Sequence, residues 1–275
     1  MREMTDNDVN GDMDDWAVWQ LVDPLLPTGG FAHSQGLESA AHSRLVAGLD
    51  ERVRDQTGWD VDTFCFEAVR NASTLMIPFV EAARGLYHPA AGAGGEKTST
   101  DWEWLDRRLG AHLAGNHVAN RASVAMGAAL IRAAIAAYEQ DEKIGQKLKE
   151  VRRISRAEKS GGHLATTFGA VVGCLGLSTR RAARLFAYLT LRDALSAATR
   201  LNLIGPLEAA ASMRRCSHRC DEMATAAASS AAALRADASK DFAVAAAVSR
   251  AANTSPLTDL IQGGHDALYS RLFSS

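Results

Sequence analysis

The sequence predicts an all-α fold, a single-domain helical bundle of about eight to ten helices. Three observations support this prediction. The 275 residues include 51 alanines, and alanine is the best helix former. Apolar residues recur at helical spacing, and no stretch sustains the alternation typical of a strand. Aromatic residues make up only 6% of the chain, so small side chains separate closely packed helices.

The domain is expected to span residues 16–275. Residues 1–15 are polar and acidic, and we expect them to be disordered. A signal peptide begins with basic residues and a transit peptide avoids acidic ones, so neither is expected here. No run of about 18 apolar residues predicts a membrane span, and the default localisation is the cytoplasm.

Proline and glycine divide the first segments. Residues 27–30, Pro-Thr-Gly-Gly, predict a loop between a short apolar segment at 16–26 and a helix at 34–46. A second helical region is expected over 60–86. Pro78 should kink or interrupt it, because proline lacks the amide hydrogen that a helix needs.

A long helix is expected after a Gly-rich surface loop at 88–99. Thr100 and Glu103 fit a capping box, in which each side chain satisfies a free backbone N–H of the first turn. The helix that they open is predicted to reach about residue 139. Gly127 near its middle is tolerable if another helix crosses there.

Glycines also organise the following segments. A charged amphipathic helix is expected over 141–160, and Gly161-Gly162 should end it. Residues 163–177 are apolar, and their Gly169, Gly173 and Gly176 would let a neighbouring backbone approach closely.

The last third of the chain is expected to contain four helices. Ser178 is a plausible N-cap, and Pro256 suits a first helical position. The expected helices cover 178–203, 207–218, 220–252 and a final one that begins at Ser255-Pro256.

Charge and cysteine content exclude several classes of protein. Lys plus Arg number 30 against 32 Asp plus Glu, a net charge of −2, so no basic field favours nucleic acid or an anionic membrane. The four cysteines are too few for a disulfide framework, and we expect reduced thiols.

The loop around Ser34 is one candidate catalytic segment. His33-Ser34-Gln35-Gly36 partly resembles a nucleophile elbow, which would make the chain a serine hydrolase. That motif needs a preceding strand, which Pro24 and Pro27 oppose. A tight loop in which Ser34 or His33 caps a helix is the favoured interpretation.

Two other candidate sites are weaker. Residues 92–99 are Gly-rich, but Glu96 interrupts the spacing of a phosphate-binding P-loop. Cys216, His218 and Cys220 could hold a soft metal, although zinc sites usually bring a second pair of ligands. Small helix-packing residues are the favoured interpretation of this cluster.

Asp193 and Arg200 lie seven residues apart on an otherwise apolar helix. Either charge would be costly to bury alone, so we expect the two to form an internal ion pair or polar seam. An interface or a water-lined passage is the alternative.

Four ordered segments carry a resemblance to a known family. They are LLPTGGFAHSQGLE at 25–38, GHLATTFGAVVG at 162–173, SAATRLNLIGPL at 196–207 and HDALYSRLFSS at 265–275. Together they resemble the UreF family of urease accessory proteins, its plant-like members most closely. Ala165 departs from the proline that many members carry, and residues 86–100 look longer than expected.

The resemblance implies an all-α homodimer without a catalytic site or a cofactor of its own. UreF-like proteins act with a UreD- or UreH-like scaffold protein, a UreG-like GTPase and apo-urease. The partners handle nickel and GTP, and the UreF-like chain bridges them. The motif residues expected to bind partners or to shape the fold are Gly29, Gly30, Phe31, His33, Ser34, Gly36, Glu38, His163, Arg200, Tyr269, Arg271, Leu272 and Phe273.

Two expectations concern the ends of this motif set. Gly29-Gly30 should be needed for a positive φ or a close backbone approach. The apolar C-terminal segment, 265–275, either packs on the core or waits for a partner. The resemblance favours the partner, so removing 266–275 is expected to leave the fold intact.

Three hypotheses therefore stand. The leading one is a non-enzymatic chaperone for urease assembly. The alternatives are a serine hydrolase that uses Ser34 and a nickel-storage protein that uses Cys216, His218 and Cys220.

Overall fold

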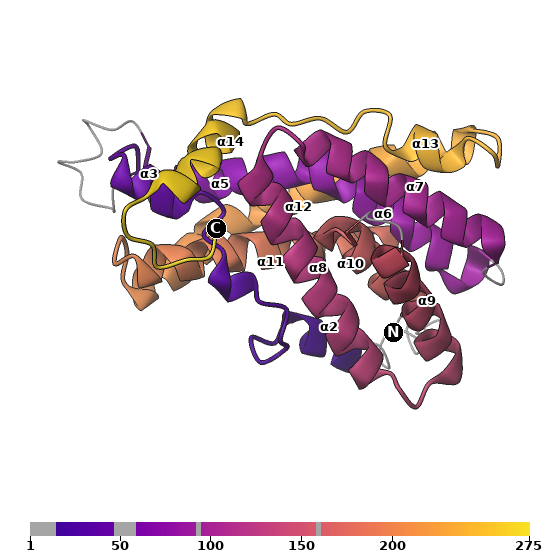
Figure 1. Cartoon of the computed structure of the whole chain (residues 1–275). Helices are drawn as coiled ribbons and strands as arrows, with labels where there is room; N and C mark the ends of the chain where they lie inside the picture. Colours follow the sequence, from indigo (N-terminus) through magenta and orange to yellow (C-terminus); the bar gives the residue numbers. More distant parts are fainter. Residues whose placement is uncertain (1–14, 47–58, 92–94, 158–160) are drawn as a thin grey trace, which may run out of the picture.

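The computed structural model describes residues 15–46, 59–91, 95–157 and 161–275, and these residues form an α-helical bundle (Figure 1). No β-strand occurs within these ranges, where Val46 and Trp59 form an isolated bridge. The all-α prediction is confirmed. The expected disorder of residues 1–15 falls almost wholly outside the described residues.

Helix α10 (Leu164–Cys174) lies at the centre of the bundle, with every residue from Ala165 to Cys174 buried. It packs against α6 (Ile77–Tyr87) through two glycines. A Cβ atom at Gly169 would lie 2.4 Å from the Val80 carbonyl oxygen, and one at Gly173 would lie 2.6 Å from that of Arg84. The predicted close backbone approach is confirmed for these two positions.

The remaining helices surround this pair, as Figure 1 shows. They are α2 (Asp15–Val22), α3 (Leu37–His42), α5 (Val61–Asn71), α7 (Glu96–Leu113), α8 (His117–Ala137), α9 (Glu142–Ala157), α11 (Thr179–Arg200), α12 (Pro206–Asp237), α13 (Ala243–Ala247) and α14 (Pro256–Gly263). Short 3-10 turns cover Gly30–Ala32, Pro89–Ala91 and Gly264–Ala267.

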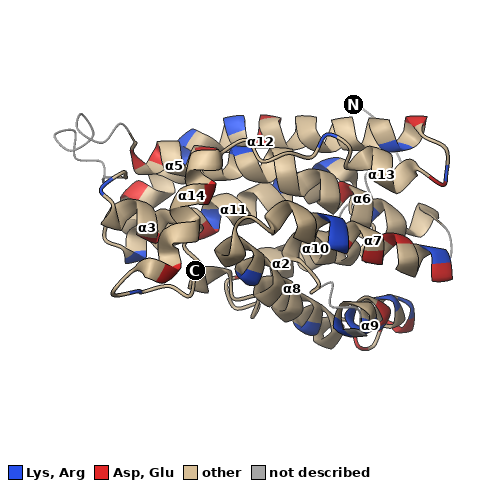
Figure 2. Ribbon diagram, turned by 45° about the horizontal axis from the view of Figure 1, so that its top comes forward, with Lys and Arg blue, Asp and Glu red and all other residues tan. Residues whose placement is uncertain are grey.

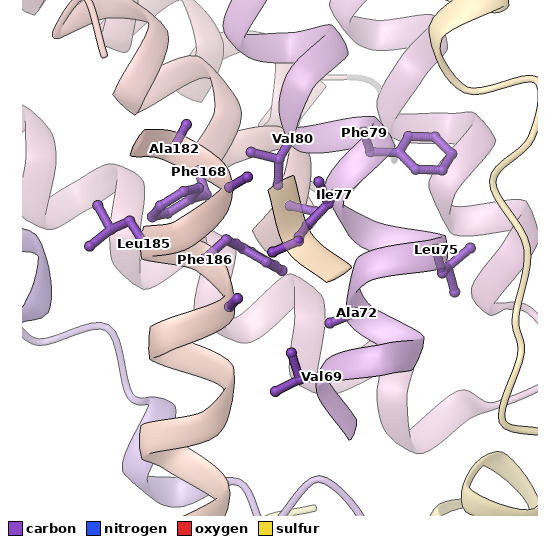
Figure 3. Close-up of a cluster of buried hydrophobic side chains, with 14 of the residues drawn as sticks. Val69, Ala72, Leu75, Ile77, Phe79, Val80, Phe168, Ala182, Leu185 and Phe186 are labelled. Carbon is purple, nitrogen blue, oxygen red and sulfur yellow. The ribbon is translucent and has the colours of Figure 1, made fainter. Parts of the chain in front are cut away.

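Aromatic and branched side chains fill the space between α6, α10 and α11. Figure 3 shows Phe168 of α10 beside Phe186 of α11, with their ring centroids 5.3 Å apart in an edge-to-face arrangement. Ile77 and Val80 of α6 extend this cluster. Small residues elsewhere bring the helices close enough for these few large side chains to fill the core.

The interruption predicted near Pro78 takes the form of a π-helical turn, Ala72–Met76, between α5 and α6. Proline cannot donate the next helical hydrogen bond, and the wider turn places it at the start of α6. The expected N-cap Ser178 is present at the start of α11, and Pro256 occupies the first position of α14 as expected.

The long helix predicted over 100–139 is wrong. Helix α7 begins at Glu96, where the Thr100 hydroxyl donates to the Glu96 carbonyl instead of capping a helix. It ends at Leu113, and Asn116 caps the new helix α8 by accepting from the Ala119 amide at 3.0 Å. The same side chain donates to Asp259 of α14, so a tertiary contact fixes the break.

The break predicted near residue 219 is also wrong, because α12 is continuous from Pro206 to Asp237. Its buried residues recur mostly four apart and form one stripe against α5, α6 and α11. The predicted helix over 220–252 stops at Asp237, where Ala238 becomes extended.

Helix α8 alone among the described helices is long and apolar enough to cross a membrane by length and composition. It packs within the bundle, where the Gly162 carbonyl oxygen would lie 2.0 Å from a Cβ atom at Gly127. The turn that enters α10, rather than a crossing helix, therefore requires this glycine.

We predict that Gly169→Ala lowers the free energy of unfolding by about 2 kcal/mol. The added methyl group meets the Val80 carbonyl, and this overpacking outweighs the gain in helix propensity of about 1 kcal/mol. Gly263→Ala is the matched control, since nothing lies within 4 Å of its Cβ position. Urea denaturation measures both, and equal stabilities would contradict the packing argument.

Candidate functional site

The N-terminal loop and the C-terminal tail meet beside α14 and α3, where Figure 1 marks the C-terminus. We call residues 29–38 together with residues 268–275 the loop–tail junction. The Ser274 amide donates to the Ala32 carbonyl at 2.8 Å, and the Ser34 amide donates to the Ser275 main-chain oxygen at 2.7 Å. Backbone hydrogen bonds thus fix the tail on the loop.

Glycine allows the loop to adopt its path. Gly29 and Gly36 have φ values of 77° and 91°, in the left-handed region that favours glycine. Gly30 has an ordinary φ, but a Cβ atom there would lie 2.3 Å from an Asp193 carboxylate oxygen. The expectation for Gly29-Gly30 is confirmed, with each glycine meeting one of the two requirements.

Glu38 is the centre of the junction and is only 1% exposed. Its Oε2 atom accepts from His265 Nε2 at 2.8 Å and from the Phe273 amide at 3.1 Å, while its Oε1 atom accepts from the Leu272 amide. His265 is fully buried, and its Nδ1 atom has no hydrogen-bond partner among the described residues. One carboxylate therefore ties α3 to the 3-10 turn that follows α14 and to the tail.

His33 and Ser34 hold the last residue of the tail. His33 Nδ1 lies 2.6 Å from Ser275 Oγ, and Ser34 Oγ donates to the Ser275 main-chain oxygen at 3.1 Å. Burial lowers the pKa of His33, and the nearby Arg121 and His265 lower it further. The expected capping role for Ser34 or His33 is wrong, because Gly36 occupies the N-cap of α3.

Arg200 is exposed and does not pair with Asp193, so the predicted ion pair is wrong. Its guanidinium donates to the Phe31 carbonyl and lies 4.4 Å from the centroid of the Phe273 ring. Asp193 is held by Arg192 at 2.6 Å. Burial raises the pKa of Asp193, and Arg192 opposes that shift. Arg200 thus contacts the loop–tail junction at Phe31 and Phe273, and sequence spacing does not reveal either contact.

The tail has a buried and an exposed side. Phe273 and Ser275 are buried, whereas Tyr269 is fully exposed and Leu272 is 53% exposed. Arg271 forms an ion pair with Asp266 at 3.2 Å. Part of the tail is therefore core, and the expectation that its removal leaves the fold intact does not fit this packing. Phe31 of the loop adds another exposed apolar side chain.

His163 lies in a separate polar network at the start of α10. Asp106 of α7 is fully buried and accepts from the amides of Gly162 and His163 at 3.0 and 2.8 Å. His163 Nδ1 lies 3.2 Å from Ser123 Oγ. Burial lowers the pKa of His163 and raises that of Asp106. Asp106 fixes the two residues that precede α10, and the Ser123 hydroxyl accepts from the Leu164 amide at its first turn, so the role of His163 here is structural.

A cavity of about 180 Å³ lies between the junction and the bundle. His33 and Gln35 of the loop, with Thr258 and Gln262 of α14, line one side of it. The opposite walls are mostly Ala, Leu, Met and Phe side chains of α5, α8, α10 and α11. The loop–tail junction therefore borders a mostly apolar cavity.

The geometry opposes the two alternative hypotheses. Ser34 is fully buried, and its hydroxyl faces Ser275 rather than a histidine base. Cys216 and Cys220 are buried, whereas His218 is exposed beside Glu222. Burial raises the pKa of Cys216 to about 11 and that of Cys220 to about 12, so both remain protonated thiols, which are poor metal ligands.

Sequence reasoning missed several residues of these networks. His265, Ser275 and Asp106 were not singled out, although His265 and Ser275 begin and end the last segment that carries the family resemblance, 265–275. Asp106 gave no signal, because one aspartate on an amphipathic helix is usually exposed.

Comparison with known proteins gives a consistent result. A family model for UreF matches residues 67–217. Urease accessory protein F of Arabidopsis thaliana is 35% identical over 261 residues, which cover 94% of this chain and 92% of that protein. The protein of the same name from Oryza sativa subsp. indica is 34% identical, covering 94% and 84%. Urease accessory protein UreF of Paenarthrobacter aurescens is 29% identical, covering 63% and 67%.

We predict that Glu38→Ala lowers the free energy of unfolding by about 3–5 kcal/mol, because several buried donors lose their acceptor at a cost of about 1–3 kcal/mol each. The change leaves His265 and the amides of Leu272 and Phe273 without their acceptor. Glu103→Ala is the control, because its exposed pair with Arg107 is worth about 0.5 kcal/mol. Similar losses in urea denaturation would show that Glu38 does not hold the junction.

We also predict a pH dependence that is specific to His33. Its pKa is lower in the folded chain than the ordinary value of about 6.5, so its contribution to stability is complete above that value and is lost as the pH falls below it. The wild-type chain should lose more stability than His33→Asn between about pH 7.5 and pH 5. Parallel stability curves for the two proteins would contradict this assignment.

Proposed function

The chain belongs to the UreF family of urease accessory proteins, and we propose that it bridges a UreD- or UreH-like scaffold and a UreG-like GTPase while nickel is inserted into apo-urease. In this proposal it acts as a non-catalytic chaperone in the cytoplasm and works as a homodimer. Nickel is the cargo of the assembly, and the partner proteins handle both nickel and GTP.

A bridging chaperone suits the chemistry of nickel delivery. Divalent ions compete for the same nitrogen, oxygen and sulfur ligands, and affinity alone selects poorly among them. A multiprotein route can select nickel over other divalent ions by the geometry of protein contacts and by the nucleotide state of a GTPase. Relatives of this chain are named as urease accessory proteins, which supports a place in such a route.

The observation that carries the proposal is the exposed side of the loop–tail junction. Tyr269, Leu272 and Phe31 are exposed, while Glu38 fixes the backbone of the tail by accepting from the Leu272 amide. Aromatic side chains dominate binding hot spots, and a preorganised surface loses less conformational entropy on binding. We therefore assign this surface to the scaffold partner.

Reconstitution tests the function itself. Urease activity is measured after mixing apo-urease, nickel, bicarbonate, GTP and the two partner proteins, with and without this chain. Activation that is equal in its absence would overturn the proposal.

We predict that the double variant Tyr269→Ala, Leu272→Ala binds the UreD- or UreH-like partner at least about tenfold more weakly. Both side chains are exposed, so the melting temperature should change little. Phe242→Ala is the matched control, because Phe242 is 68% exposed beside α13, away from the junction. Equal affinities of the two variants for the partner, measured by calorimetry, would place the scaffold contact elsewhere.

A further inference from the structure

Helix α9 has one buried face and one strongly basic face. Leu148, Val151 and Ile154 are buried against the bundle. On the outer side, Lys149, Arg152, Arg153 and Arg156 line one surface hollow. We call these four residues the basic stripe. Figure 2 shows the blue basic residues of α9 at the edge of the bundle.

The stripe follows the helix axis. Its members are spaced i, i+3, i+4 and i+7, so they lie on one side of the helix over about 10 Å. Such spacing spreads the four positive charges over about two successive turns on the same side of the helix. A partner that matches it needs negative groups spread along a line rather than gathered at one point.

Most of this charge has no counter-ion among the described residues. Arg153 pairs with Glu150 at 2.7 Å, and Glu150 also accepts from the Ser99 hydroxyl. No carboxylate of the described residues lies within ion-pair distance of Lys149, Arg152 or Arg156.

The chemistry favours carboxylates of a protein over phosphates of a nucleic acid. Nucleic-acid sites neutralise many phosphates and lie in broadly basic domains, whereas this chain has a net charge of −2. A single small anion would reach only part of a 10 Å stripe. Arginine forms paired hydrogen bonds with carboxylates, and a segment with one acid per helical turn would match the spacing.

We propose that the basic stripe is a docking surface for an acidic segment of a partner protein. The stripe lies on α9, at the opposite end of the bundle from the loop–tail junction (Figure 1). It therefore provides a second, electrostatic contact surface, and this inference does not rest on the scaffold contact assigned to Tyr269 and Leu272.

The test uses the full chain and a fluorescent helical peptide of alanine and glutamate, with glutamates one turn apart. Fluorescence anisotropy at low salt measures its affinity, because added salt screens exposed ion pairs. We expect Arg152→Gln, Arg156→Gln to weaken binding about tenfold. The control Arg132→Gln, Arg250→Gln removes the same charge from exposed positions elsewhere and should change affinity less than about twofold.

Three outcomes would overturn the proposal. Equal losses for the two double variants would show that only net charge attracts the peptide. Tighter binding of a DNA duplex through the same residues would identify a nucleic-acid surface. Binding seen only when Asp6, Asp8, Asp12 and Asp14 are changed to Asn would mean that the chain's own acidic residues compete for the stripe. Circular dichroism confirms that each variant is folded.

Discussion

A buried carboxylate must be paired, and the pairing of Glu38 determines how both ends of the described chain are arranged. The tail amides of Leu272, Phe273 and Ser274 could not be left without acceptors in the interior at low cost. Glu38 accepts from the first two and the Ala32 carbonyl accepts from the third, while Ser34 donates to the Ser275 main-chain oxygen. Because His265 is bound to the same carboxylate, the 3-10 turn that follows α14 is held by the same group. The exposed side chains of the tail owe their fixed positions to this one group.

The same principle recurs at the centre of the bundle. Asp106 is a buried carboxylate that accepts from the amides of Gly162 and His163 just before the first turn of α10, where the helix dipole favours a negative charge. Glycines at 169 and 173 then let α10 lie against the backbone of α6. Two acidic side chains from other helices thus fix the start of the central helix and the end of the chain.

Local signals explain which parts of this structure the sequence could predict. Ser178 and Pro256 act on their immediate neighbours, and Gly169 and Gly173 are needed only because they lack a side chain, so the roles of all four were predicted correctly. The break before Asn116 and the continuity of α12 depend on contacts with distant helices, and both were predicted wrongly. In the loop–tail junction, most residues singled out from the sequence lie together, but their pairing was not predicted and His265 and Ser275 were missed. Arg200 lies seven residues from Asp193 yet contacts Phe273, which no periodicity can show.

The loop–tail junction also has a kinetic meaning. Glu38 and Phe273 are separated by 235 positions in the chain, and closing so long a loop costs entropy that no local contact repays. Contacts of this range form late in folding, after helices with near neighbours have assembled. The tail also follows all other described residues during synthesis, so Glu38 of α3 can bind the amides of Leu272 and Phe273 only after residues 265–275 have been translated. The exposed surface on the tail therefore depends on contacts with residues about 235 positions earlier in the chain.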